Sequence, residues 1–402
     1  MPDIQTDFHE SVLTLRCRVK DKHASFLKAQ AREVNFVFNY CNDLSFKVLQ
    51  REGTFCSSAY LDKFTAGATK VGLSLHSQTV QAISKELVTR RHQFKKAKLK
   101  WRVSGGPRRS LGWIPFKASA VSYRQGQVWY CGKPICLWDS YGLKDYDLGM
   151  GSFSEDARGR WYFNVTVKVQ AKPMCRVPLA SGAIGIDLGQ KTFMADSSGV
   201  EVPAHRLYRK AEEKLASAQR ACKKDRVRSL HADIKNQRKD EQHKLTRGQV
   251  DAQCAVFVGN VNASGLAKAG QGKSVLDASW SSYRTMLKYK CHLAGVWFSE
   301  INESYTTQEC HVCHARTGPK GQADLGIRDW VCLDCGTAHG RDHNAAINIR
   351  ERGLKWLELQ ISAASGESYE PALVVNKAFD SLGSKAAAGY GRLAGGIPVL
   401  FA

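Results

Sequence analysis

The sequence predicts a multidomain protein in which an α/β core follows a small β-rich domain that is interrupted by helices. At 402 residues, the chain has room for two or three domains. Residues 111–169 read as short strands separated by Gly, Pro and Asp. Residues 183–302 follow a β-β-helices-β-α-β succession, which is typical of an α/β domain.

The β-rich domain is expected to gain one strand from the start of the chain. Residues 11–19 alternate apolar and polar side chains, as a half-buried strand does. Residues 24–50 and 77–96 instead have helical periodicity, and they separate this strand from the rest of its domain. The composition changes around residues 173–181, where we expect a domain boundary.

The α/β core is predicted to begin with a strand, a tight turn and a second strand over residues 183–199, with Asp187 near the end of the first strand. Residues 206–247 are polar and helical, with 14 Lys or Arg and 6 Asp or Glu, which suits an exposed helical pair that contacts nucleic acid. The remaining elements are a strand at 254–261, an amphipathic helix at 274–295 and a strand at 296–302.

The overall charge narrows the class of partner. Lys and Arg total 59 against 37 Asp and Glu, a formal net charge of +22. Nucleic acid is the usual polyanion that neutralises such an excess, although a merely basic or ribosomal-type protein has a similar balance. The 13 cysteines are an odd number, and we see neither a signal peptide nor an apolar run of about 18 residues. We therefore expect a cytoplasmic protein of a reducing compartment, with no membrane partner.

A basic run follows the second predicted helix. Between Arg90 and Arg109 there are nine Lys or Arg and no acidic residue. A solvated helix end is the plain alternative, but unrelieved like charge favours a surface that binds phosphates. The candidate nucleic-acid-binding residues are Arg90, Arg91, Lys95, Lys96, Lys98, Lys100 and Arg102.

Four cysteines have the spacing of a zinc ribbon. Cys310-x-x-Cys313 and Cys332-x-x-Cys335 are separated by 18 residues. Four thiolates complete a tetrahedron, so the predicted zinc is structural and has no open position for water. The neighbouring histidines are interpreted as loop or nucleic-acid contacts rather than ligands, and they are His311, His314, His339 and His343.

Two carboxylates far apart in the sequence form a second candidate site. Asp187 ends an apolar strand, where a charge needs a partner, and Asp342 stands at the head of a predicted helix. Asp342 alone could be an N-cap. Together, the two could share divalent cations of the kind that hydrolyse phosphodiesters in pairs about 3.5–4 Å apart.

Several motifs together resemble one family. "GIDLG" at 185–189, "YTTQECHVC" at 305–313 and "RDHNAAINI" at 341–349 are similar to TnpB proteins, as are "WIPFK" and "GRWYFNVTV" upstream. TnpB proteins are transposon-encoded RNA-guided DNA endonucleases (OrfB-like transposases) related to the compact type V CRISPR effectors. The resemblance covers roughly residues 11–355, with weaker support before Leu75.

The resemblance implies an RNase H-like RuvC nuclease domain with an inserted zinc ribbon, a β-barrel wedge domain and a helical recognition domain. It also implies a guide RNA, target double-stranded DNA, catalytic Mg²⁺, a bacterial cytoplasm, and a monomer or homodimer on one guide RNA. In this interpretation the ribbon delivers Asp342 beside Asp187. The expected segments are the wedge domain at 1–23 and 111–175, the recognition domain at 24–110, the nuclease domain at 176–305 and 337–361 with a helical insert at 203–250, the zinc ribbon at 306–336, and a loosely ordered tail at 362–402.

One position departs from the family. Relatives usually carry a third catalytic carboxylate, a Glu, at the place of Gly259 in "VFVGNVN". We predict that Glu303, just after the next strand, replaces it, so that Asp187, Glu303 and Asp342 are the catalytic residues and the magnesium ligands. Glu300, on the strand itself, is the fallback, and Asn260 is a minor neutral ligand.

Two other functions remain open. If no glutamate replaces the missing one, the chain would be a nuclease-dead RNA-guided repressor that binds DNA. A transposase that joins DNA directly is less favoured, because no Tyr in a His-rich metal motif stands out as a nucleophile.

Overall fold

The computed structural model describes residues 10–175 apart from 69 and 71, residues 182–262, residue 272, and residues 277–320 and 323–364. The described residues up to Val169 form one compact unit and those from Gln170 onward form another. We describe each unit by itself. Residues 1–9 and 365–402 lie outside the described part, and with them nearly all of the predicted C-terminal tail.

The first unit is built on a seven-stranded sheet with the order β2-β6-β7-β1-β5-β4-β3. Its core contains Phe116, Phe153 and Phe163, whose ring centroids lie 5.2–5.5 Å apart. The strands are β1 (Glu10–Val19), β2 (Trp113–Phe116), β3 (Val121–Arg124), β4 (Gln127–Tyr130), β5 (Lys133–Trp138), β6 (Leu148–Glu155) and β7 (Trp161–Gln170).

This sheet corrects the predicted β-barrel. Strands β2 and β3 stand at opposite ends of the hydrogen-bonded order, and no pairing joins them among the described residues, so the barrel is not closed. Both end strands are only four residues long. Pro115 in β2 lacks a backbone donor and therefore suits an edge strand. Helices α1 and α3 pack against β2.

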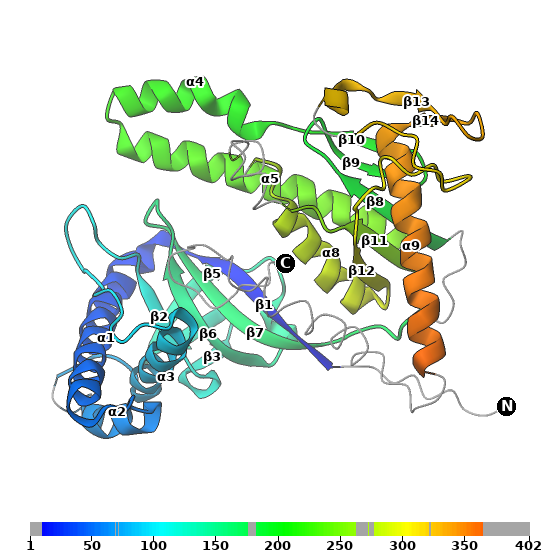
Figure 1. Ribbon diagram of the computed structural model, residues 1–402. Helices are drawn as coiled ribbons and strands as arrows, with labels where there is room; N and C mark the ends of the chain where they lie inside the picture. The colour runs from blue at the N-terminus through cyan, green and yellow to red at the C-terminus, as the bar shows by residue number, and fades with distance from the viewer. Residues whose placement is uncertain are drawn as a thin grey trace. The chain divides into compact units, whose positions relative to one another are not determined.

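Three helices lie between β1 and β2 in the sequence: α1 (Ala24–Glu52), α2 (Ser58–Thr65) and α3 (Ser77–Phe94). Helices α1 and α3 fall on the two predicted helical segments, whereas α2 was not predicted. Along α1, Leu27, Val34 and Cys41 are fully buried at helical spacing. This stripe places α1 on the core shared with the sheet (Figure 1).

Residues 95–104, which we call the basic strap, run from the end of α3 along α1. The Asn39 side chain donates to the Arg102 carbonyl and accepts from the Arg102 amide, both at 2.8 Å. Asn42 pairs in the same way with the backbone of Leu99, at 2.8 and 3.1 Å. The strap is therefore held on the helix mainly through its own backbone.

The second unit contains a five-stranded sheet with the order β10-β9-β8-β11-β12. Strands β8, β11 and β12 are parallel, while β9 and β10 are antiparallel to their neighbours. This is the predicted β-β-helices-β-α-β succession. The bounds are β8 (Ala183–Leu188), β9 (Thr192–Asp196), β10 (Glu201–Pro203), β11 (Ala255–Gly259) and β12 (Trp297–Ile301).

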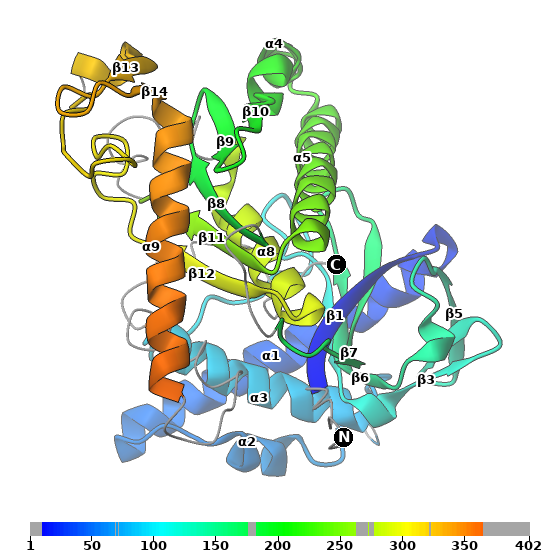
Figure 2. The same cartoon turned by 90° about the vertical axis from the view of Figure 1, so that its right-hand side faces the viewer.

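Helices cover both faces of this sheet. Helix α9 (Arg341–Ala364) lies along one face, and α8 (Trp280–Ala294) along the other (Figures 1 and 2). Helices α4 (Leu207–Arg220) and α5 (Lys224–Ala252) form an antiparallel hairpin, and α5 also packs on α8. Helix α9 runs three residues past the predicted end of the nuclease domain at residue 361.

A small two-stranded sheet precedes α9. Strands β13 (Asp329–Val331) and β14 (Ala338–Gly340) pair antiparallel, and β14 leads directly into the helix. Among the described residues, no helix combines the length and the apolar character needed to cross a membrane.

Candidate functional site

The four predicted zinc cysteines come together. The sulfurs of Cys310, Cys313, Cys332 and Cys335 all lie within 4.8 Å of one another. The Cys310–Cys335 and Cys313–Cys332 sulfur pairs are 3.6 and 3.5 Å apart. A zinc ion with Zn–S bonds of about 2.3 Å sets tetrahedral sulfurs about 3.8 Å apart, so the geometry fits a four-thiolate zinc.

The cysteine cluster is tied to the start of α9. His339, on β14, has its Nε2 3.1 Å from the Cys310 sulfur, and its ring packs on Trp330 at 4.5 Å between centroids. A ring N–H that donates to a thiolate is a usual support for a metal ligand. The Arg341 amide, at the first residue of α9, donates to the Arg328 carbonyl of the ribbon.

Asp187 lies where three parallel strands end. Its strand β8 is the neighbour of β11, and β11 is the neighbour of β12, so the carboxyl ends of all three strands meet at one edge. Ala183, four residues earlier on β8, belongs to the hydrophobic core that α9 covers. Because side chains alternate along a strand, Asp187 faces the same side, toward α9.

Glu303 fills the space that a side chain at Gly259 would need. A Cβ atom built on Gly259 would lie 2.5 Å from the Glu303 Oε2 and 3.4 Å from its Cβ. Gly259 pairs with Ile301, and Glu303 follows Ile301 by two residues, which puts both on the α9 face. The glutamate side chain thus lies in the space beside Gly259, the position at which the resemblance implies a third carboxylate.

Glu300 points to the other face of the sheet. It alternates with Ile301 on β12, and its carboxylate pairs with Arg284 of α8 at 3.1 Å. Glu300 is therefore separated from Asp187 by the sheet itself. Of the two glutamates considered from the sequence, the geometry brings Glu303 to the aspartates and leaves Glu300 in an ion pair.

The segment that carries Glu303 is fixed to α9 by polar side chains that the sequence analysis did not single out. The Asn344 and Asn348 amides each donate to the carbonyls of Thr306 and Glu309, at 2.7–3.1 Å. Arg352 donates to two more carbonyls on either side of Glu303, both at 2.9 Å. A sequence signal existed: two asparagines four residues apart lie beside the apolar stripe of α9.

Asp342, the second residue of α9, is held by an arginine from the ribbon. Arg328 Nη1 donates to both Asp342 carboxylate oxygens, at 2.8 and 2.9 Å. The side chain of Asp342 is 16% exposed. Arg328 was not singled out from the sequence, because its pairing with Asp342 depends on the fold of the ribbon.

The two buried carboxylates of the site, Asp187 and Glu303, both have raised pKa values. Burial, together with the charges of Glu303 and Asp342, raises the pKa of Asp187 to about 8, against the opposing charges of Arg341 and Arg328. Burial also raises the pKa of Glu303 to about 7, against the nearby Arg284. The Glu303 Oε2 is buried and has no hydrogen-bond partner. A buried carboxylate oxygen without a partner invites a proton or a cation.

These shifts predict how pH acts on the magnesium-free protein. Because the pKa of Glu303 is raised on folding, the folded state holds its proton more tightly, and stability falls as pH rises from about 4.5 toward 7. We expect Glu303→Gln to raise the unfolding free energy at pH 8 by on the order of 1–3 kcal/mol, with little gain at pH 4.5. Thermal unfolding at both pH values measures this. Glu300→Gln is the control, and an equal gain there would contradict the prediction.

The three carboxylates do not meet as tightly as the four cysteines. In the described part of the chain, the cysteine cluster is the one group of three or more His, Cys, Asp or Glu whose ligand atoms lie within 4.8 Å of one another. Like charges repel, and Arg328 competes for Asp342. The ligands of a metal pair need not converge on one point, because the two ions are themselves about 3.5–4 Å apart.

The predicted nucleic-acid residues divide into two groups. Arg91 is 3% exposed and donates to the Cys56 carbonyl and the Ser45 hydroxyl, with Phe55 stacked on its guanidinium. Arg102 donates to Asn35 and to the Leu111 carbonyl, and burial lowers its pKa to about 10. Both guanidinium groups thus form hydrogen bonds within the first unit.

Among the others, Arg90 pairs with Glu86 and Lys98 with Asp43. The exposed lysines of the set are Lys95, Lys96 and Lys100.

We expect these three lysines to account for much of the salt-dependent RNA binding of the first unit. Replacing Lys95, Lys96 and Lys100 with Ala should reduce the slope of log affinity against log salt by roughly 2–3, since each neutralised phosphate contributes about 0.7–0.9. Filter binding across a salt series measures the slope. The matched control replaces Lys63, Lys70 and Lys144, which are also exposed. Equal slopes for the two triple variants would contradict a specific role for the strap.

Comparisons with known proteins agree with the fold. The family described as Cas12f1-like, TNB domain matches residues 280–349, from α8 to the start of α9. A cryo-EM structure of a Cas12f1–sgRNA–target DNA complex superposes with a TM-score of 0.52, at 11% identity, over 82% of this chain and 83% of that one. The chain therefore has a Cas12f-like multidomain fold with mixed α/β sheets.

Two curated relatives carry the name of a proposed RNA-guided DNA endonuclease. One, from Streptomyces pristinaespiralis, is 28% identical over 273 residues, which is 64% of this chain and 65% of that protein. The other, InsQ from Escherichia coli K12, is 24% identical over 223 residues, 48% of this chain and 54% of that protein. The matches thus span about half to two thirds of these relatives. The resemblance to the TnpB family is confirmed, and the chain is a relative of that family.

Proposed function

We propose that the protein is an RNA-guided DNA endonuclease that hydrolyses phosphodiesters in a RuvC-type, RNase H-like site. The observation that carries the proposal is the placement of Glu303. Its carboxylate fills the space beside Gly259, where the resemblance to the TnpB family implies a glutamate, and its charge helps to raise the pKa of Asp187. A decaying site would have no reason to keep this compensation.

The residues present fit divalent magnesium. Oxygen ligands are those that Mg²⁺ prefers, and the site offers three carboxylates, one of which has a buried oxygen without a partner. Asp187, Glu303 and Asp342 would hold the metal. When bound, magnesium supplies an activated water and stabilises the charge on the leaving oxygen.

The protein's own groups orient this site. Asp187 is fixed by its strand, Glu303 by the asparagines and Arg352 of α9, and Asp342 by the first turn of α9. Arg328 now donates to Asp342, and it could donate to an anionic phosphate oxygen if a metal took its place on that carboxylate. Its position supports a role in stabilising negative charge at the cleaved phosphate.

The partners follow from the same proposal. The strap lysines and the basic α4–α5 hairpin would bind the guide RNA, whose pairing reads the target DNA sequence. The four cysteines would hold a structural zinc, which keeps the ribbon folded and α9 in place. The seven-stranded sheet with its three helices would serve as the wedge and recognition domains.

Guide-dependent cleavage with magnesium tests the proposal. The purified protein with its guide RNA should cut matched double-stranded DNA, and Asp187→Ala or Asp342→Ala should remove cutting while guide-directed binding persists. Binding to matched DNA without any cutting, in the native protein, would favour the nuclease-dead repressor instead. The nuclease-dead function is worth testing because Arg328 pairs with the Asp342 carboxylate and so competes with a metal for it.

A further inference from the structure

A cavity of about 810 Å³ lies in the second unit, outside the carboxylate site. It is enclosed by the β8–β9 turn, by the segment that leads from β10 into α4, and by the middle of α5. Its size is that of pockets that take small organic ligands, which range over about 300–1,000 Å³. Neither the carboxylates nor the zinc cysteines use it.

The interior of the cavity is apolar. It is lined by Phe193, Val202, Ala204, Leu207, Leu245 and Ala278. The Phe193 ring is held edge-on against Tyr283, at 5.2 Å between centroids and 83° between planes. The orientation of Phe193 is therefore fixed before any ligand arrives. A fixed aromatic ring with aliphatic neighbours is a surface on which a flat nucleobase packs well.

The rim of the cavity is cationic. Five Lys or Arg line it against two acidic residues, Glu241 and Asp277. Both acids already have partners: Glu241 lies 3.6 Å from His205, and Asp277 accepts from Arg238 at 2.6 Å. Asp277 also accepts from the Tyr208 amide at the start of α4. Asp277 is thus paired with a cation, while the histidine beside Glu241 carries a charge only when it is protonated.

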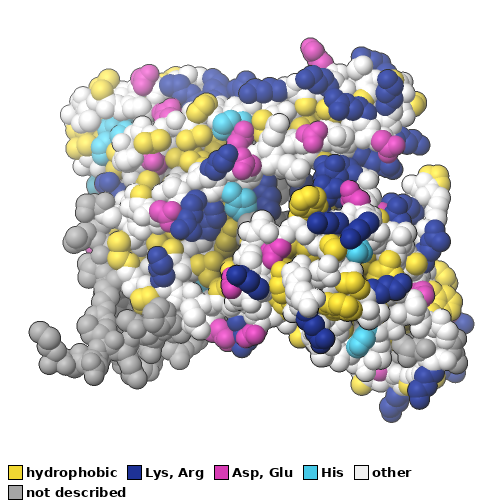
Figure 3. All heavy atoms as spheres, turned by 180° about the vertical axis from the view of Figure 1, so that it is seen from behind, with side chains coloured by type: hydrophobic (Ala, Val, Ile, Leu, Met, Phe, Trp, Pro, Cys, Tyr) yellow, Lys and Arg dark blue, Asp and Glu magenta, His cyan; other side chains and the backbone are white. Residues whose placement is uncertain are grey.

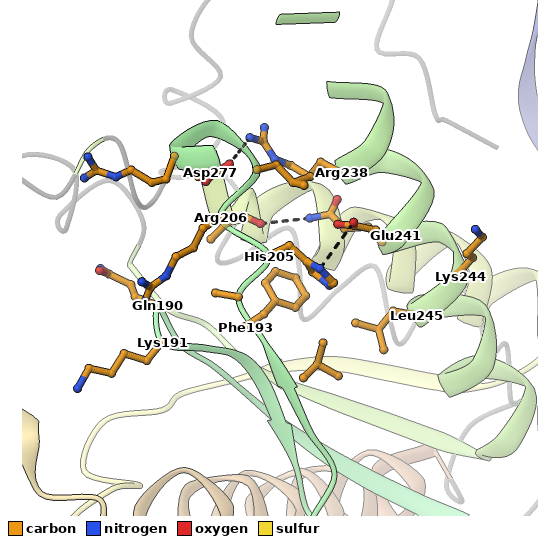
Figure 4. A pocket seen from close by; sticks show the side chains of 16 residues that line it. Gln190, Lys191, Phe193, His205, Arg206, Arg238, Glu241, Lys244, Leu245 and Asp277 are labelled. Carbon is orange, nitrogen blue, oxygen red and sulfur yellow. Dashed lines mark hydrogen bonds and ion pairs between the residues drawn. The ribbon is translucent and has the colours of Figure 1, made fainter. Parts of the chain in front are cut away.

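Two of the cations are available to an external anion. Lys191 and Arg206 are exposed, and within the described part of the chain neither forms an ion pair. Arg209 and Lys244, by contrast, pair with Glu212 and Asp240 on their own helices. Figure 4 shows Lys191 and Arg206 on one side of the pocket with Gln190, while α5 supplies the side chains of the other.

We propose that this cavity binds one unpaired nucleotide of a nucleic-acid strand, with its base against Phe193 and Leu245 and its phosphate at Lys191 and Arg206. The proposal rests on the proposed function for the class of partner. A strand is favoured over a free nucleotide, because the α4–α5 hairpin continues the positive charge away from the pocket. Lys and Arg side chains gather over this hairpin along the upper edge of Figure 3.

The position of the pocket near Asp187 predicts that a bound nucleotide affects where the strand is cut. Lys191 follows Asp187 by four residues, so their Cα atoms are at most about 15 Å apart. A nucleotide anchored here would fix the register of the strand that reaches the carboxylates. Loss of the anchor would then spread the cut over neighbouring phosphodiesters.

Fluorescence of 2-aminopurine in single-stranded RNA and DNA 12-mers tests the binding without magnesium, and so without cleavage. We expect the probe to respond when its base enters the pocket. Replacing both Lys191 and Arg206 with Glu should raise the Kd at least tenfold. Ala204→Phe, which fills the pocket, should remove the fluorescence response, and Leu245→Trp is a second such variant should the first not fold by circular dichroism.

The matched control replaces Lys210 and Lys214 of α4 with Glu, which removes the same charge outside the pocket. It should weaken binding but keep the response. Persistence of the response in both filled variants would overturn the proposal. Equal competition by free nucleoside monophosphates would overturn the preference for a strand. The RNA and DNA arms identify the source, as guide or as target.

Cleavage assays distinguish a failure of the proposed nucleotide pocket from a failure of the proposed nuclease function. A spread of cut positions in the Lys191 and Arg206 variant supports the anchor. If the native protein binds the probe in the pocket but never cuts DNA, the pocket proposal is retained and the nuclease proposal is rejected. A nuclease whose cut positions and probe response are unchanged in the variant would reject the pocket alone.

Discussion

Glu303→Ala is expected to abolish magnesium-dependent cleavage, by about 10³-fold or more, although the resemblance implies a catalytic glutamate at Gly259 and not at residue 303 in the sequence. Without it, Asp187 and Asp342 alone would have to hold the metal, and less negative charge would remain to bind it. Guide-directed DNA binding should survive, since pairing and backbone contacts do not involve this carboxylate. Timed cleavage assays beside a binding assay measure both.

The most informative control is a double variant that removes the carboxylate at residue 303 and places one at Gly259. The backbone at Gly259 does not take a left-handed conformation, so it accepts a side chain once Glu303 is cut back. Glu303→Ala with Gly259→Glu should therefore recover part of the cleavage. Gly259→Glu alone should not help, because its Cβ would lie 2.5 Å from the Glu303 Oε2.

Glu300→Ala should leave cleavage nearly unchanged, because Glu300 pairs with Arg284 on the far face. Full activity of Glu303→Ala would sink the relocated-glutamate hypothesis.

Cys335→Ser is expected to release zinc and to disable the nuclease without touching a carboxylate. Structural zinc contributes roughly 10–16 kcal/mol in small zinc-binding peptides, so its loss should unfold the ribbon. Strand β14 and the Arg328–Arg341 backbone bond would then no longer fix the first turn of α9. Asp342 would lose its position, while Asp187 and Glu303 would keep theirs.

Metal analysis, hydrogen exchange and cleavage assays check this prediction together. Cys222→Ser is the control, since Cys222 is exposed and lies outside the cluster. Exchange should rise over residues 306–345 and stay unchanged in the first unit. Full zinc content in Cys335→Ser, or loss of protection in residues 10–169, would contradict the structural role.

The sequence predicted what depends on local pattern. The cysteine spacing gave the cluster, because two close pairs across a short loop can hardly avoid one another. The apolar strand before Asp187 gave its place at the end of β8. Which glutamate would face Asp187 was harder, since β12 is apolar on both faces and its alternation does not mark a side. The sheet register and α9 decide that question together.

Properties that depend on distant partners could not be predicted in the same way. Strand patterns predicted a β-rich domain, but not the number or order of its strands or whether its ends would meet. The run from Arg90 to Arg109 predicted a basic surface. Arg91 and Arg102 instead point inward and bond to side chains more than 40 residues away in the sequence. Arg328 pairs with Asp342 only because the ribbon folds back on α9.

The two asparagine pairings that hold the basic strap on α1 leave the side chains between them, at residues 100 and 101, free to change. Asn39 and Asn42 recognise backbone groups, which every residue except proline supplies in full. Lys100 and Trp101 between them carry none of the attachment, and both are exposed. Substitutions at these two positions, in evolution or by design, could therefore change the surface offered to a nucleic acid. The backbone hydrogen bonds that hold the strap on α1 would stay the same.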